Sequence, residues 1–132
     1  MELHIELSFT YPRDNADKLE SLFNQMLDGS RGAAIEDGFA ELGEPIEVAL
    51  EELLDKHGLE HFMNVEHFER EGCQFEVAYT SGGWAEGYLR DLVAFMQLLQ
   101  CTDIQAGLHA DESEEHCELS DDGEIICTTN DY

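Results

Sequence analysis

The chain has 132 residues, of which 31 are acidic and 6 are Lys or Arg, so its formal net charge at pH 7 is −25. A field of this sign repels phosphate, which argues against direct binding to DNA, RNA or an anionic membrane and favours a basic protein surface as partner. The length and the 42% of hydrophobic residues fit one globular domain, 1–132, with a single core.

The N-terminal segment predicts a strand followed by a helix. Apolar and polar residues alternate through 2–11, which is the pattern of a half-buried strand, and Pro12 ends it. Asp14 is a suitable N-cap for a helix whose apolar residues recur at helical spacing through 19–27. Gly29 supplies the stop after that helix. We expect one face of the helix to pack on the sheet.

A less regular segment and a second helix come next. Residues 29–44 predict a loop with one short helix. Pro45 suits the first turn of a further helix, which Gly58 ends. The segment 61–71 then predicts a strand, and a tight turn returns the chain through another strand at 73–80.

The C-terminal half predicts a long apolar helix over 84–100, a strand over 104–110 and a terminal hairpin. The hairpin pairs 116–119 with 125–129 across the turn "SDDGE". The resulting order is β-α-(α)-β-β-α-β, followed by β-β. It predicts an α+β protein: a ferredoxin-like split βαβ sandwich with an inserted helix and a C-terminal β-hairpin, in which helices cover one face of a mostly antiparallel sheet.

The cysteines indicate a reducing environment. There are four of them, and they form no C-x-x-C pair and follow no zinc-ribbon spacing. The N-terminus alternates and carries acids, so it does not resemble a signal peptide, and no apolar run is long enough to span a membrane. We therefore expect a cytoplasmic protein with free thiols. The cysteines are Cys73, Cys101, Cys117 and Cys127.

The histidines and acids do not predict a specific metal site. His57 and His61 are four residues apart, but Gly58 lies between them where the helix is expected to end, so they are not expected to share a helix face. The acidic segment 111–122 offers oxygens at alternate positions but lacks the glycine at the sixth position of a calcium loop. We therefore expect no dedicated metal and no cofactor.

No catalytic constellation stands out either. His116 and Cys117 are adjacent, but neighbours in a strand point to opposite faces and therefore form no catalytic pair. The glycine-rich stretch 80–87 lacks the lysine of a phosphate-binding loop and the spacing of a dinucleotide-binding turn, so it predicts a strand-to-helix turn. Paired carboxylates carry no signal in a chain where acids are everywhere. We therefore expect a protein that is not an enzyme.

The arrangement of the acids is the remaining signal. We expect one group on the outer face of the sheet, a second as a stripe along the helix that begins near Pro45, and a third in the C-terminal loop and hairpin. Acids four apart on a helix repel each other by about 0.2–0.5 kcal/mol per pair, so such a stripe is not built for stability. The candidate partner-binding residues are Glu2, Glu6, Glu44, Glu47, Glu51, Asp55, Glu76, Asp111, Glu112, Glu114, Glu115, Asp121 and Asp122.

Two functional hypotheses follow. In the first, the acidic surface occupies a basic surface of a nucleic-acid-binding protein, as DNA-mimicking or anti-CRISPR-type phage inhibitors do; carboxylates take the place of phosphates, association is fast and strongly salt-dependent, and an apolar or aromatic anchor is still needed. In the second, this is an ordinary α+β domain, such as an immunity protein, a small-molecule binder or a small enzyme, whose acidity serves solubility or salt adaptation. The sequence leaves the oligomeric state open.

Overall fold

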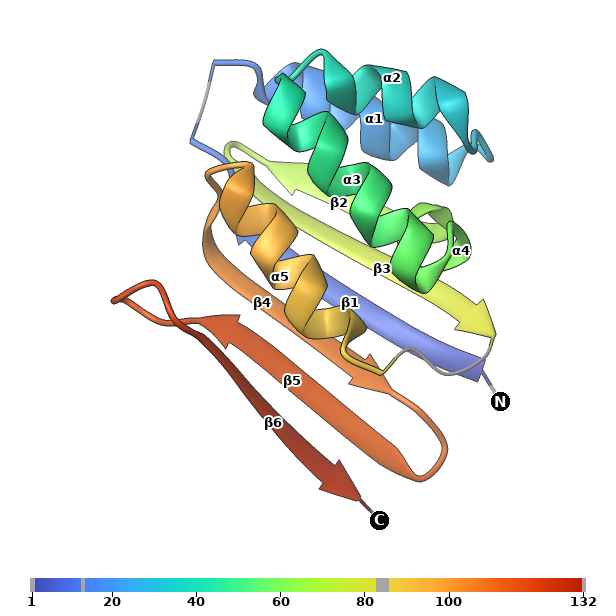
Figure 1. Cartoon of the computed structure of the whole chain (residues 1–132), viewed down its shortest axis with the longest axis vertical. Helices are drawn as coiled ribbons and strands as arrows, with labels where there is room; N and C mark the ends of the chain where they lie inside the picture. The colour runs from blue at the N-terminus through green and yellow to red at the C-terminus, as the bar shows by residue number, and fades with distance from the viewer. Residues whose placement is uncertain (1, 13, 83–85, 132) are drawn as a thin grey trace.

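The computed structural model describes residues 2–12, 14–82 and 86–131. It is an α+β structure, as the sequence predicts, in which the described residues form five helices and one six-stranded sheet, with the helices on one side of the sheet (Figure 1). The elements along the chain are β1 (Glu2–Thr10), α1 (Ala16–Leu27), α2 (Ala33–Ala40), α3 (Glu44–His57), α4 (Glu60–Met63), β2 (Val65–Glu71), β3 (Gln74–Gly82), α5 (Tyr88–Leu98), β4 (Thr102–His109), β5 (Ser113–Leu119) and β6 (Ile125–Asp131).

The sheet has the strand order β2-β3-β1-β4-β5-β6, and every neighbouring pair is antiparallel. β1 lies inside the sheet, between β3 and β4. Its predicted alternation is confirmed, because Leu3, Ile5, Leu7 and Phe9 are all at most 2% exposed. The residues between them point to the other side of the sheet, since successive side chains in a strand alternate.

The covered side of the sheet holds the hydrophobic core. α1 packs on β2, and α5 packs on β4 and β5. Within the helical layer, the Phe39 ring of α2 lies 5.6 Å from that of Phe62 in α4 and 5.9 Å from that of Phe95 in α5, measured between ring centroids. On the sheet side, Phe9 and Phe75 stack with their ring centroids 5.1 Å apart. None of the described helices is long and apolar enough to cross a lipid bilayer.

The predicted start of the first helix and the predicted start of the strand at 61–71 are wrong. The residue before α1 is Asn15, not Asp14, and the Tyr11 hydroxyl donates a hydrogen bond to its side chain at 2.8 Å. The segment 61–71 begins with the short helix α4 before β2. His61, Phe62 and Met63 are consecutive and all buried, and a strand with only one buried face cannot place three successive side chains inside.

The last helix is shorter than predicted. α5 begins at Tyr88, directly after Gly87 at φ 77°, and ends at Leu98. The backbone at Gly87 is left-handed, which favours glycine and separates the helix from the preceding turn. The predicted start at residue 84 lies outside the described residues.

The predicted C-terminal hairpin is confirmed, but only two of the four cysteines are free thiols as predicted. β5 and β6 pair in a register that sets Cys117 opposite Cys127, and these two cysteines form a disulfide. Cys73 and Cys101 are free thiols. The expectation of a fully reduced chain is therefore wrong for the hairpin, because the register of the turn brings two sulfur atoms together that are ten residues apart in sequence.

Candidate functional site

The predicted acidic residues do not share one surface. The α3 stripe is exposed, as predicted, but it lies in the helical layer on the covered side of the sheet. Glu6 of β1 and Glu76 of β3 lie on the opposite, uncovered side, together with Glu114 of β5. The α3 stripe consists of Glu44, Glu47, Glu51 and Asp55.

The remaining candidates lie elsewhere. Glu115 faces the helices, because it pairs directly with the buried Leu108, and burial raises the pKa of its carboxyl group. Glu2 opens β1 opposite Gly82, and its side chain is outside the described part of the structure. The others lie in the two hairpin turns: Asp111 and Glu112 between β4 and β5, and Asp121 and Asp122 between β5 and β6.

We call the uncovered side of the sheet the open face. It is built from the residues of each strand that alternate with the buried ones, and their neighbours follow from the strand registers. Its members include His67, Glu69 and Glu71 of β2; Gln74, Glu76, Ala78 and Thr80 of β3; His4, Glu6, Ser8 and Thr10 of β1; Gln105, Gly107 and His109 of β4; Glu114, His116 and Glu118 of β5; and Ile126, Thr128 and Asn130 of β6.

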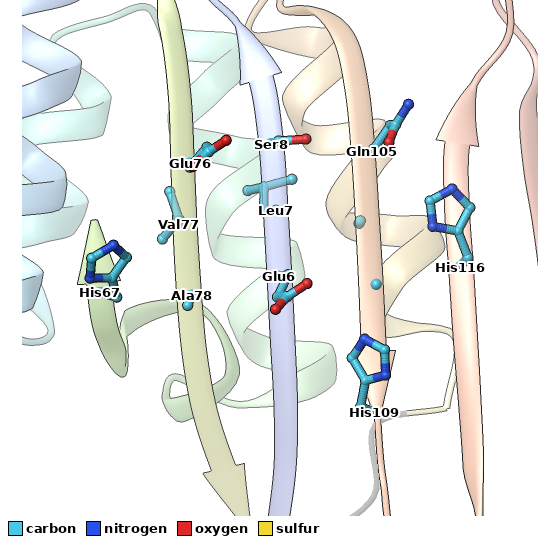
Figure 2. Close-up of a pocket in the computed structure, with 12 residues that line it drawn as sticks. Glu6, Leu7, Ser8, His67, Glu76, Val77, Ala78, Gln105, His109 and His116 are labelled. Atoms are coloured by element: carbon cyan, nitrogen blue, oxygen red, sulfur yellow. The ribbon is translucent and has the colours of Figure 1, made fainter. Parts of the chain in front are cut away.

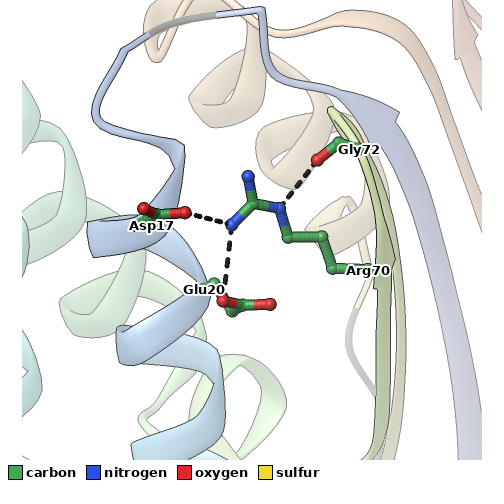
Figure 3. Close-up of polar contacts among 4 residues, drawn as sticks. All are labelled: Asp17, Glu20, Arg70 and Gly72. Atoms are coloured by element: carbon green, nitrogen blue, oxygen red, sulfur yellow. Dashed lines mark hydrogen bonds and ion pairs between the residues drawn. The ribbon is translucent and has the colours of Figure 1, made fainter.

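The basic side chains of the described residues all belong to the helical side. Arg70 starts on β2 but turns toward α1, where its Nη1 lies 2.7 Å from Asp17 and 3.3 Å from Glu20, while its Nε donates to the Gly72 carbonyl at 2.7 Å (Figure 3). Lys18 pairs with Glu41, and Lys56 lies 2.9 Å from Asp91. The other two are Arg31, before α2, and Arg90, on α5.

The open face therefore carries carboxylates and imidazoles, and no Lys or Arg within the described ranges. His67 Nε2 lies 3.3 Å from Glu69, and His116 Nε2 lies 3.9 Å from Glu118.

A depression of about 390 Å³ lies in the middle of the open face (Figure 2). One cross-strand row runs through it in the order His67, Ala78, Glu6, Gly107 and His116. Glu6 stands between two positions with little or no side chain, and a histidine stands at each end of the row. With strands about 4.8 Å apart, the two histidine backbones are separated by roughly 19 Å.

Gly107 contributes no side chain to the depression that it lines, and the fold itself does not require a glycine there. It lies in a regular part of β4 and is not among the glycines with positive φ. A Cβ added to it would meet only His109 Nε2 at 3.7 Å and the Glu115 carbonyl oxygen at 3.9 Å, which are ordinary contacts. Glycine inside a strand weakens the strand and often marks the close approach of another molecule.

Comparison of the chain with protein-family models, with curated proteins and with solved structures gave no match. The side chains of the open face include carboxylates, which accept hydrogen bonds and attract cations, and they are held on a sheet of paired strands. Among the residues that the structure describes, no three His, Cys, Asp or Glu side chains come together in a way that could hold a metal ion.

A second polar cluster lies inside the helical side. Ser81 Oγ and His61 Nδ1 are 2.6 Å apart, and both residues are buried, at 3% and 4% exposed. Burial lowers the pKa of His61. This resembles a serine–histidine pair, which the sequence did not reveal, but its hydroxyl does not reach the surface and so cannot meet an external substrate in this conformation.

The two histidines that the sequence placed four apart have separate partners. His61 contacts Ser81, whereas His57 Nε2 lies 2.7 Å from Asp91 Oδ2. Burial alone would raise the pKa of Asp91, but the hydrogen bonds from His57 and Lys56 outweigh it and hold that pKa below its ordinary value. This cluster ties α3 to α5, which is a structural role.

Sequence reasoning missed the small residues of the open face. It placed Glu6 and Glu76 on one surface because both alternate with buried residues. It passed over Ala78 and Gly107, which face the same way. The available signal was the glycine at a polar position of the alternating segment 104–110, because glycine is depleted in strands.

Proposed function

We propose that this is a non-enzymatic acidic binding protein whose open face occupies a basic surface of a partner protein. One observation carries the proposal: within the described residues, every Lys and Arg lies on the helical side, while the open face presents only acids, imidazoles and small or neutral side chains. Acidity that serves solubility alone does not require such a separation.

The partner we propose is a nucleic-acid-binding protein. Its phosphate-binding surface is rich in Lys and Arg, and carboxylates fixed on a rigid sheet can take the place of phosphates on such a surface. Long-range attraction would make association fast and strongly dependent on salt. DNA-mimicking and anti-CRISPR-type phage inhibitors act in this way, and the proposal places this chain in that functional class by its chemistry.

We also propose that the first four strands form a ferredoxin-like split βαβ sandwich. Three features support this: the order β2-β3-β1-β4, antiparallel pairing throughout, and the placement of α1 and α5 on the same side. α2, α3 and α4 would then be insertions between β1 and β2, and β5-β6 a C-terminal extension. In this arrangement one side of the sheet stays uncovered, which leaves it free for a partner.

The test is a capture experiment with two variants of equal charge. The open-face variant carries Glu6→Gln, Glu69→Gln and Glu76→Gln, and the helix variant carries Glu44→Gln, Glu47→Gln and Glu51→Gln. Each loses three negative charges, so general electrostatics affects both alike. Immobilised wild-type protein and both variants are exposed to bacterial lysate at low and moderate salt, and the retained proteins are identified.

We expect wild type and the helix variant to retain a basic nucleic-acid-binding protein that added DNA releases, and the open-face variant to lose it. Equal loss in both variants would reduce the proposal to unspecific charge attraction. If wild type retains nothing specific and folds only in molar salt, then salt adaptation explains the acidity and the protein is not a mimic.

A further inference from the structure

The open face is not uniform, because it contains a trough beside Gly107. We define this Gly107 trough by the residues Glu6, Ala78, Gln105, Gly107, His109 and His116. Most of the open face is covered by its own side chains, but around Gly107 the backbone of β4 is bare. In Figure 2, Gln105 and His109 stand beyond the two ends of this bare stretch, with Glu6 on one side of it and His116 on the other. The trough is part of the larger depression of the open face, which is open to solvent and about 390 Å³ in volume, near the lower end of the range for small-ligand sites.

We infer that this trough receives a single arginine side chain from the basic partner. The inference rests on the proposed function and names the group that anchors the complex. An exposed carboxylate that meets a cation on a flat, wet surface contributes little affinity, because water and salt screen the pair. A side chain that enters a depression is shielded from water by the walls, and interface anchors are typically arginine or aromatic residues seated in such depressions.

The lining favours a guanidinium group over an ammonium group. Glu6 supplies two carboxylate oxygens, and Ser8 and Gln105 add a hydroxyl and an amide oxygen to the same depression. Guanidinium has five donors in one plane and can bind a carboxylate with two of them, whereas ammonium is a compact point charge. The rings of His109 and His116 flank the bare backbone, and a planar guanidinium can stack on such rings.

Charge decides between arginine and other occupants. A phosphate or a nucleic acid would meet Glu6 and Glu76, with no Lys or Arg on this face among the described residues to balance them. A second copy of this chain, packed face to face, would set the same carboxylates against each other. A basic segment meets complementary charge on this face, and its long side chain can lie in the trough over the β4 backbone, between Glu6 and His116.

The experiment measures the affinity of a fluorescent, end-capped peptide of alternating arginine and glycine, at about 150 mM salt, and of its lysine counterpart with equal length and charge. We expect wild type to bind the arginine peptide about 10-fold more tightly than the lysine peptide. Gly107→Val fills the trough without removing any charge. It should lower the affinity for the arginine peptide about 10-fold and make the two peptides equal.

Gly107→Val should fold at least as well as wild type, because the new Cβ meets only ordinary contacts and valine favours strands. A melting curve checks this directly. Ala78→Val fills the trough from the other side of Glu6 and serves as a second, independent variant. Thr128→Val lies in the same cross-strand row, opposite His116 on β6 but outside the trough, and should bind both peptides like wild type.

The outcomes separate the inference from the proposed function. If Gly107→Val and Ala78→Val bind the arginine peptide as tightly as wild type, or if wild type does not distinguish the peptides, the trough is not an arginine site. The open face still stands as the binding surface in that case, provided that the open-face variant loses the peptide and the helix variant keeps it. If both charge variants lose the peptide, or if wild type does not bind it, both the arginine site and the proposed function are overturned. A wild-type dimer that Gly107→Val converts to a monomer in sedimentation would make a second copy the occupant.

Discussion

The two sides of the sheet are built from alternate residues of the same strands, and they differ in whether cationic side chains lie near their acids. On the covered side, some acids of the helices have nearby cations, as in Lys18–Glu41, Lys56–Asp91 and Arg70–Asp17. On the open face, the ion pairs found among the described residues are with imidazoles: His67–Glu69 and His116–Glu118. The difference teaches that the cations of the described residues are not spread evenly, because all of them lie on the side where the helices pack and none lies among the acids of the open face.

The strongest test of this division compares neighbours on β3. Phe75 is 1% exposed and packs against Phe9, Phe23 and Phe68, so Phe75→Ala should lower the free energy of unfolding by about 3–5 kcal/mol. Glu76→Ala changes the next residue, on the open face, and should change it by less than about 0.5 kcal/mol. Urea denaturation measures both. Similar losses at the two positions would mean that the open face is packed rather than free.

The disulfide gives the next largest effect. β5 and β6 are the last two strands at one edge of the sheet (Figure 1), and the Cys117–Cys127 bond closes their hairpin. The double variant Cys117→Ala, Cys127→Ala should lose about 2–4 kcal/mol of unfolding free energy. A thiol reductant should destabilise wild type similarly and leave the double variant unchanged. Cys73→Ser changes an exposed free thiol and is the control; if its stability falls equally, the hairpin bond is not the cause.

A smaller effect follows from the buried histidine of the helical side. Burial holds the pKa of His61 below 6.5, so the unfolded chain takes up the proton first as the pH falls. The stability that neutral His61 contributes is complete above about pH 6.5 and is lost as the pH falls from there through its folded-state pKa. His61→Phe should flatten the fall in melting temperature over that window. Parallel curves for variant and wild type would contradict the prediction.

The smallest predicted effects have opposite signs on the two sides. Glu69 and Glu76 lie directly opposite each other on β2 and β3, and like charges so placed repel, so Glu69→Gln should raise stability by about 0.2–1 kcal/mol at low salt. Glu41→Gln removes the partner of Lys18 and should lower stability by up to about 1 kcal/mol. Both changes should shrink in high salt. The same sign at low salt for both would show that the two sides do not differ in charge balance.

Much of the fold was readable from local patterns. The alternation in β1, the proline that opens α3, the glycine that ends it and the turn between β5 and β6 each have a local physical cause, and each prediction is confirmed. The prediction failed at 61–63, where three consecutive buried residues depend on what packs around them. It also failed for the thiols, because whether two cysteines meet depends on the pairing register of the hairpin.

The candidate site was readable only in part. Glu6 and Glu76 were predicted to share a face because strand alternation is a local rule, but the α3 stripe was predicted without a side, and it lies on the other one. Gly107 is conspicuous in the sequence only as a glycine at a polar strand position. That it lies between Glu6 and His116 across the sheet could not be predicted, because strand order and register are tertiary facts.

The alternation in β1 has a consequence for how this protein can diverge. Odd-numbered residues of the strand determine whether the chain folds, and even-numbered ones determine what it presents to other molecules. Selection can therefore act on the two sets almost independently. Under the proposed function, descendants of this chain can exchange the even set to follow a changing partner while they inherit the same interior. Rapid substitution at Glu6 and its neighbours, beside near-constancy at Leu7, would then be the genetic sign of coevolution with that partner.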